Sequence, residues 1–282
     1  MEIDLKYKNE SQVLRIVKGE VPYLEYPMLA ETGVVKHGFS TRLGGVSEGC
    51  YASMNLSFTR GDKEECVREN FRRIAEAIGV RCEDMVFSQQ THTTNVRTVT
   101  EEDRGMGMMR PLEYTDVDGL VTNIPGICLV TFYADCVPLF FVDPVKHVIG
   151  LSHSGWRGTV GKIGKVTIER MCQEYGCDVR NILAAVGPSI CQDCYEVSGD
   201  VAEQFERNFV RQDRKELFYQ KENGKYQLDL WKANELILKE VGIAEEHIAV
   251  TNVCTHCNSE VLYSHRTAGD KRGNLAAFLA LR

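Results

Sequence analysis

Hydrophobic positions along the chain recur with two spacings, one typical of helices and one typical of buried strands. Four stretches with helical spacing are predicted to form helices. The first begins near Asp62, which could cap it, and the next two cover about residues 158–174 and 198–209. The fourth starts at Asp229 and ends before Gly242. The inward positions of the first helix are Val67, Phe71, Ile74 and Ile78.

Short apolar runs rich in β-branched and aromatic residues lie between the predicted helices. Runs of this length and composition are typical of buried strands. They cover residues 127–133, 139–142, 148–151, 182–186 and 248–253. Strands mixed with helices in this way predict an α/β protein. No repeat and no linker rich in Pro, Gly or Ser divides the chain, so we expect a single domain. Residues 101–113, where glycines and methionines alternate with charges, are expected to form a mobile loop.

Composition and charge narrow the class of protein. Hydrophobic residues make up 43% of the 282 residues, which allows a sizeable core. The net charge of -7 argues against broad binding to nucleic acid or to anionic membranes. The apolar runs are far shorter than a membrane-spanning helix, and the charged first residues lack the apolar region of a secretory signal. We therefore expect a cytoplasmic protein, with its oligomeric state open.

Eleven cysteines in a reducing compartment favour metal binding or catalysis over disulfides. Polar segments at the ends of the apolar runs bring in the candidate chemistry: Gln90 and His92, then Asp135 and Cys136, then His153. In α/β folds such loops often hold catalytic groups. Two histidines, one cysteine and an open position would suit a catalytic zinc. The spacing is irregular, however, so these residues could also be ordinary buried or hydrogen-bonded side chains.

Seven short segments, taken together and in order, resemble the YfiH-type family. This family is also called the laccase-domain or multicopper polyphenol oxidase family. The resemblance runs from about residue 37 to the C-terminus. The segments are residues 37–47 (HGFSTRLGGVS), 90–92 (QTH), 118–122 (DGLVT), 134–138 (ADCVP), 153–158 (HSGWRG), 187–190 (GPSI) with 194–197 (CYEV), and 254–255 (CT) with 264–266 (SHR). Ser154 departs from the family, which usually has Ala at that position.

The resemblance implies a fold and a domain plan. The fold would be a single-domain layered α/β sandwich with mixed sheets, distantly similar to the catalytic domain of cytotoxic necrotizing factor. Residues 37–282 would form the catalytic domain, and residues 1–36 an N-terminal extension of the same fold.

The resemblance also implies an activity and a metal. The activity is that of a purine nucleoside phosphorylase acting on adenosine, inosine and S-methyl-5'-thioadenosine, with adenosine deaminase activity as well. The substrates would be purine nucleosides and phosphate. The metal, zinc or alternatively copper, would be held by His92, Cys136 and His153, which would also be the catalytic residues.

Further residues are candidates for binding substrate. Arg42 and Arg157 could bind phosphate, because the guanidinium fork matches phosphate oxygens. Gln90 is placed in the same substrate-binding set, and Asp135 could orient a metal ligand. Either arginine could instead close an ion pair, and Asp135 could cap a turn. Trp156 could stack on a base or pack in the core.

Two CxxC pairs, Cys191 with Cys194 and Cys254 with Cys257, compete for a metal. Such pairs often form a structural zinc site. Their separation of about sixty residues is long for a zinc ribbon, and the family pattern resembles only Cys194 and Cys254. We therefore expect the pairs to have separate roles that do not involve a metal.

Three other functions stay open on the sequence. One is copper-dependent oxidation of phenols, although seven histidines are few for a multicopper cluster. Another uses Cys136 as a thiolate nucleophile with His153 as its base, as in a deamidase. The third is a non-catalytic protein that stores metal through its cysteines.

Overall fold

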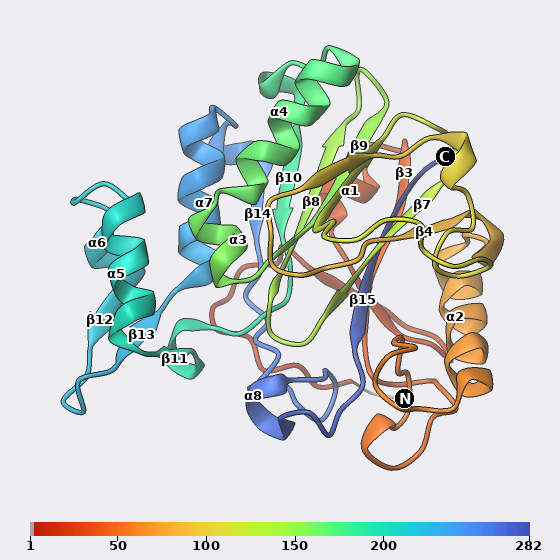
Figure 1. Cartoon of the computed structure of the whole chain (residues 1–282), viewed down its shortest axis with the longest axis horizontal. Coiled ribbons are helices and arrows are strands. Elements are labelled where there is room, and N and C mark those ends of the chain that lie inside the picture. The colour runs from red at the N-terminus through yellow and green to blue at the C-terminus, as the bar shows by residue number, and fades with distance from the viewer. Residues whose placement is uncertain (1–2) are drawn as a thin grey trace.

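Two six-stranded sheets form the body of the protein in the computed structural model, which describes residues 3–282 (Figure 1). The first sheet contains, in spatial order, β1 (Arg15–Val17), β2 (Tyr23–Glu25), β3 (Val35–Ser40), β15 (Leu275–Leu281), β7 (Cys128–Tyr133) and β4 (Met85–Phe87). The second contains β14 (Ile248–Val250), β10 (Leu183–Val186), β8 (Val137–Asp143), β9 (Val148–Ser154), β6 (Gly119–Thr122) and β5 (Val96–Thr98). Each sheet has both parallel and antiparallel pairs, as expected.

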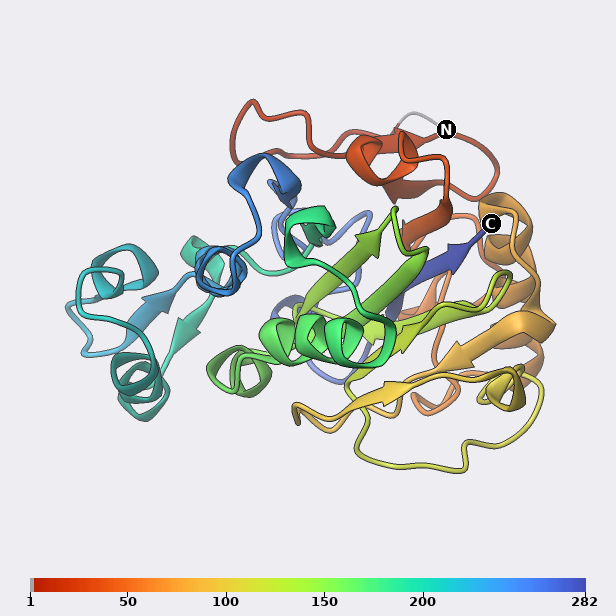
Figure 2. The same cartoon turned by 90° about the horizontal axis from the view of Figure 1, so that it is seen from above.

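The main core lies between the two sheets, because side chains alternate across each strand. In β7, Leu129 belongs to this core, whereas its neighbour Val130 packs on the other face with helix α2 (Glu64–Ile78). The same alternation in β8 sends Phe140 into the central core and Phe141 toward the helices on the far side. The result is a helix–sheet–sheet–helix sandwich (Figure 2).

The predicted helices are present, with two differences. Helices α2, α5 (Gly199–Asn208) and α7 (Leu230–Val241) match their predictions closely. The helix expected over 158–174 is instead divided into α3 (Trp156–Val160) and α4 (Ile163–Tyr175), because Lys162 adopts a left-handed conformation with φ of 58°. Asp62 does not cap α2, since its carboxylate accepts hydrogen bonds from the side chains of Ser47 and Asn55. Three short helices are α1 (Pro27–Ala30), α6 (Arg214–Leu217) and α8 (His265–Ala268).

A small third sheet projects from one side of the body together with α5 and α6 (Figures 1 and 2). Its antiparallel strands, in spatial order, are β11 (Glu196–Val197), β13 (Tyr226–Leu228) and β12 (Phe218–Gln220). Single 3₁₀ turns occur at Gly49–Tyr51, Cys82–Asp84, Glu101–Asp103, Val179–Asn181, Gln192–Cys194 and Glu245–His247.

Residues 101–113 differ from the mobile loop that we expected. Met106 and Met108 are buried, and the carbonyl of Gly105 accepts backbone hydrogen bonds from Met109 and Arg110. Gly107 has a φ of 93°, and a Cβ there would lie 2.6 Å from the Phe87 side chain. The segment differs from the expectation because two of its three methionines, Met106 and Met108, are buried, whereas Met109 is 55% exposed.

The N-terminal residues contribute to the same sheet as the rest of the chain, since β2 pairs with β3. That the whole chain unfolds as one cooperative domain stays a prediction. Within residues 3–282, every helix is too short or too polar to cross a bilayer.

Candidate active site

Three segments that are far apart in sequence meet at one end of the central strands. His92 lies in the segment between β4 and β5, Cys136 directly precedes β8, and His153 lies in β9. Strands β8 and β9 are antiparallel, with Pro138 opposite His153. This register places Cys136 beside His153, and the segment after β4 brings His92 to the same point.

The three side chains form one compact cluster. Their candidate ligand atoms all lie within 4.8 Å of one another. The Cys136 Sγ is 3.9 Å from the His92 Nε2, and the two imidazole rings are 5.0 Å apart between centroids. His153 is buried, Cys136 is half-buried and His92 is exposed. The cluster is therefore closed at His153 and open to solvent at His92.

Asp118 organises this cluster from behind. Its buried carboxylate lies 2.8 Å from the Nδ1 of His153, which leaves the Nε2 of that ring to face the cluster. It also accepts backbone hydrogen bonds from Thr91, His92 and Thr93. These bonds fix the left-handed conformation of His92, whose φ is 67°. One carboxylate thus orients one imidazole and fixes the loop that carries the other.

Neighbouring charges shift the pKa values of these groups. Burial would raise the pKa of Asp118, but His153 and the backbone donors lower it to about 2. Burial would also raise the pKa of the Cys136 thiol, but His153 and His92 outweigh it and lower this pKa. The pKa of His153 is raised, because Cys136 and Asp118 outweigh the effect of burial. The geometry therefore favours a thiolate at Cys136, the form that binds metals or attacks electrophiles.

Two small residues next to His153 leave room for the cluster. A Cβ on Gly155 would lie 2.7 Å from the His92 ring and 3.2 Å from the Cys136 Sγ, so a side chain there would displace both. The hydroxyl of Ser154 instead bonds to Thr159 and Asn234, within the core. The departure from Ala at Ser154 therefore leaves the cluster undisturbed.

A cavity of about 660 Å³ opens above the cluster. Its volume is in the range of small-molecule sites. Its lining combines aromatic and aliphatic side chains with two arginines. The residues that matter for its chemistry are Phe58, Arg60, Leu112, Phe132, Arg272 and Asn274, together with His92, Cys136 and His153.

The two arginines of this cavity were missed in the sequence. Arg272 is 6% exposed, and its Nε has no hydrogen-bond partner among the described residues. Burial and the positive charge of Arg60 lower the pKa of Arg272 to about 10. Arg60 has one carboxylate contact, to the exposed Asp270 at 3.4 Å. No local motif marks these residues, because the fold alone brings them to the cavity.

The arginines expected to bind phosphate lie elsewhere. The guanidinium of Arg42 donates to the carbonyls of Ala52 and Ser259 and lies over the ring of Tyr263. It therefore joins loops, and it does not line the cavity. Arg157 is exposed and stacks on Trp156, and it does not line the cavity either. Neither position supports the phosphate-binding role that we expected.

Gln90 and Asp135 are structural in their observed contacts. Gln90 lines the cavity, but its amide forms two hydrogen bonds of 2.7 Å with the backbone of Phe132. The carboxylate of Asp135 accepts from the hydroxyl of Thr255 and the backbone N–H of Arg266. Asp135 therefore joins loops, and the orienting role proposed for it belongs to Asp118.

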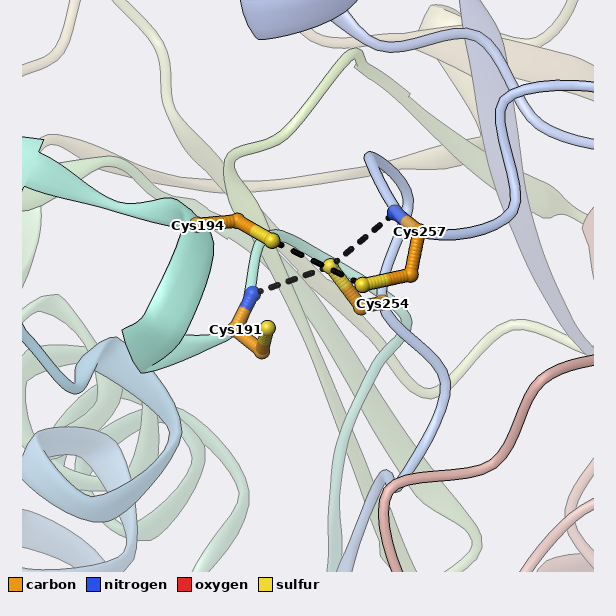
Figure 3. A group of neighbouring side chains, drawn as sticks. All are labelled: Cys191, Cys194, Cys254 and Cys257. Carbon is orange, nitrogen blue, oxygen red and sulfur yellow. Dashed lines mark hydrogen bonds between the residues drawn. The ribbon is translucent and has the colours of Figure 1, made fainter.

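The two CxxC pairs also come together, contrary to the expectation of separate roles. Figure 3 shows the side chains of Cys191, Cys194, Cys254 and Cys257 converging from two loops. Their sulfur atoms all lie within 4.8 Å of one another. This second cluster does not line the cavity.

Comparison with known proteins places these features in context. Residues 36–282 match the family described as multi-copper polyphenol oxidoreductase laccase. The purine nucleoside phosphorylase YlmD of Bacillus subtilis is 37% identical over 248 residues, which cover 87% of this chain and 88% of that protein. Adenosine deaminase RL5, from an unknown prokaryotic organism, is 36% identical over 83% of this chain and 90% of its own.

A solved structure confirms the fold that the resemblance implied. The crystal structure of the Bacillus licheniformis hypothetical protein YfiH matches with a TM-score of 0.89 and 31% identity. The match covers 96% of this chain and 100% of that one.

Proposed function

The chain belongs to the family described as multi-copper polyphenol oxidoreductase laccase, and from this premise we propose that it is a metal-dependent purine nucleoside phosphorylase with adenosine deaminase activity. Relatives named for each activity support the proposal. The observation that carries it is the shared cavity, whose lining includes the His92, Cys136 and His153 cluster together with two arginines. A phosphorolytic enzyme needs an anion site and a nucleoside site side by side.

The cluster fits a zinc ion in the chemistry of its donors. His92, Cys136 and His153 would be the ligands, and Asp118 behind His153 supplies the carboxylate that metal-binding histidines commonly have. A bound zinc ion would act as a Lewis acid and favour deprotonation of water at the open side of the cluster. The same nitrogen and sulfur donors accept copper, so copper is the alternative metal.

Arg60 and Arg272 are the proposed phosphate site, in place of Arg42 and Arg157. Both arginines line the cavity, and the Nε of buried Arg272 has no hydrogen-bond partner within residues 3–282. A phosphate dianion would relieve the repulsion between these two cations and supply the missing acceptor.

The remaining wall suits a nucleoside. Phe58 and Phe132 line the cavity, where an aromatic side chain could pack against a purine ring. In phosphorolysis a phosphate oxygen bonds to C1' of the ribose, and the bond from C1' to the purine nitrogen breaks. The leaving purine takes the bonding electrons and then a proton, giving the free base and the 1-phosphate of the sugar, which is ribose 1-phosphate for adenosine and inosine. Adenosine, inosine and S-methyl-5'-thioadenosine share this bond and are the proposed substrates.

In deamination, water replaces the amino group at C6 of adenosine, and ammonia leaves. His92 is the exposed imidazole of the cluster and lines the cavity, so it can also reach bound substrate. Asp118 would keep the Nε2 of His153 directed at the cluster in both reactions.

A cysteine-nucleophile deamidase is the second candidate. Cys136, His153 and Asp118 form a thiol, imidazole and carboxylate series of the kind that activates a nucleophile. This reading gives no role to His92, although that residue lies in the same cluster.

Product analysis tests the proposal. Purified protein incubated with adenosine and phosphate should release adenine and ribose 1-phosphate, and also inosine and ammonia, detected by chromatography. Without phosphate, only the deamination products should remain. Removing the metal with a chelator should abolish both reactions, and adding zinc should restore them. Full activity in the metal-free protein, lost on alkylation of Cys136, would instead support the thiol nucleophile.

A further inference from the structure

We propose that Cys191, Cys194, Cys254 and Cys257 bind a structural zinc ion, separate from the metal of the candidate active site. We call these four residues the tetracysteine cluster. The proposal does not depend on the proposed function, because it concerns different residues and a different kind of site.

The distances between sulfur atoms match a single tetrahedral ion. All four sulfurs lie within 4.8 Å of one another, and those of Cys194 and Cys257 are 3.5 Å apart. Zinc–sulfur bonds of about 2.3 Å place the corners of a tetrahedron about 3.8 Å apart. A disulfide would need about 2.05 Å, and all four cysteines are free. The cluster thus has the size of one ion with four thiolate ligands.

Local backbone geometry already supports a charged sulfur. The backbone N–H groups of Cys191 and Cys257 donate to the Sγ of Cys254 at 3.3 and 3.5 Å. Donors directed at sulfur favour the thiolate, which is the form that binds zinc. Each pair is also held in a tight turn: Cys194 N–H donates to the Cys191 carbonyl, and Asn258 N–H donates to the Cys254 carbonyl.

The fold removes the objection raised by the long sequence separation. Strands β10 and β14 are parallel neighbours, so the chain leaves both at the same end of the sheet. Beyond them, Ser189 and Cys254 form a parallel bridge, and the N–H of Thr255 donates to the carbonyl of Ser189. The two CxxC turns therefore lie side by side although about sixty residues separate them in the sequence.

The cluster has the character of a structural site. Four cysteines complete the tetrahedral shell of zinc and leave no position for substrate. Cys191 and Cys254 are buried, and the cluster lies outside the cavity lining. Its neighbours hold the turn before Cys136, since Ile190 N–H and the Thr255 hydroxyl both donate to Asp135. A zinc ion here would fix the two loops that support that turn.

Metal analysis of the full chain tests the proposal. Protein purified from zinc-containing medium should hold two equivalents of metal, and Cys136→Ala should keep one. X-ray absorption at the zinc edge of Cys136→Ala should show four sulfur neighbours at about 2.3 Å and no imidazole. Cys194→Ser with Cys257→Ser should lose one equivalent and keep the other, whereas Cys50→Ser, at an exposed cysteine, should keep both.

The outcomes separate this proposal from the proposed function. Nitrogen neighbours or no zinc in Cys136→Ala would overturn it, as would an equivalent of iron or four cysteines oxidised to disulfides. The absorption measurement does not require the double variant to fold. A chain that contains the four-sulfur zinc but no phosphorolysis or deamination would keep this proposal while the proposed function failed.

Discussion

Residues 3–282 contain two clusters of candidate metal ligands, and the clusters differ in donor set and in exposure. The active-site cluster offers two nitrogens and one sulfur, and exposed His92 opens it to a cavity. The tetracysteine cluster offers four sulfurs and lies outside that cavity. Zinc needs four ligands, so three donors leave a place for chemistry and four donors close the site. The number of donors therefore distinguishes a candidate reaction centre from a candidate structural one.

The two clusters are also built by different means. At the active site, a buried side chain, Asp118, holds His153 and the loop of His92 across long sequence distances. At the tetracysteine cluster, backbone N–H groups of Cys191 and Cys257 hold the sulfur of Cys254. A single side-chain substitution should therefore disturb the first cluster more readily than the second.

The strongest test of this comparison is Cys136→Ala. Two imidazoles hold zinc poorly, so the variant should lose the active-site metal and nearly all turnover of adenosine. Metal content and product formation measure both losses. His92→Ala and His153→Ala should behave in the same way, and Cys50→Ala is the matched control. Normal turnover with the active-site metal retained in Cys136→Ala would remove the basis for the open site.

The stability of the protein in acid should also depend on His37, so the effect of this residue has to be measured before acid unfolding is used to compare the clusters. His37 lies apart from both clusters, and its Nε2 accepts the backbone N–H of Tyr26. Burial lowers its pKa from 6.5 to about 4. Between pH 6.5 and pH 4 the unfolded chain binds a proton at His37 more readily than the folded chain does. The contribution of neutral His37 to stability is therefore complete above pH 6.5 and is lost as the pH falls to 4.

The expected size of this effect is about 3 kcal/mol in the free energy of unfolding, from the shift in pKa. Urea unfolding of metal-free protein at pH 7 and pH 4 measures it. His37→Gln should lose less stability than the parent chain over that interval, because glutamine does not titrate. An equal loss in the two proteins would show that other groups cause the acid sensitivity.

Arg60 and Arg272 provide a further difference between the two clusters, because only the active-site cluster should have an anion site beside it. Arg60→Gln and Arg272→Gln should each raise the phosphate KM by about ten- to a hundredfold, from the loss of a charged hydrogen bond. Initial rates over a range of phosphate concentrations measure this effect. Arg157→Gln, outside the cavity, is the control and should change little. Unchanged phosphate dependence in both cavity variants would exclude this phosphate site.

Asp118→Asn should weaken binding of the active-site metal without removing any of its three ligands. Loss of the carboxylate behind a metal-binding histidine commonly lowers metal affinity or activity by about 10–100-fold. A competitive chelator titration should show this weakening at the active site, with the tetracysteine metal unchanged. Asp116→Asn, at an exposed neighbour, should leave both affinities unchanged. Weakening of both metals would point to a general loss of structure.

The sequence pattern correctly predicted the elements with strong hydrophobic periodicity. It missed an element whose conformation depends on the strands beside it in the sheet. Helices α2 and α7 have a clear apolar face, and β7 and β8 are continuous apolar runs. Strand β15 was missed, although it lies in the centre of a sheet and is buried along its whole length. Its repeated alanines have no strand preference of their own, so its place depends on the pairing with β3 and β7.

The sequence identified the reactive residues of the candidate site better than it identified the residues that position them or line the cavity. His92, Cys136 and His153 are chemically conspicuous, and the structure brings them together, while their role as ligands stays a prediction. Asp118 was present in a recognised segment, but nothing in its neighbours indicates that it contacts His153. Arg272 reaches the cavity only through the fold. Local spacing carries no information about such contacts.

The position of the tetracysteine cluster also affects the entropy of the chain segment between its two CxxC turns. The projecting sheet, α5 and α6 all belong to the chain segment between Cys194 and Cys254, which begins at one CxxC turn and ends at the other. A metal bound by the four sulfurs would close this segment into a ring. Bringing the ends of a long flexible segment together costs conformational entropy. A crosslink between the ends reduces the entropy that the segment still has to lose when it folds. Folding of the projecting region would then depend on the zinc supply of the cell.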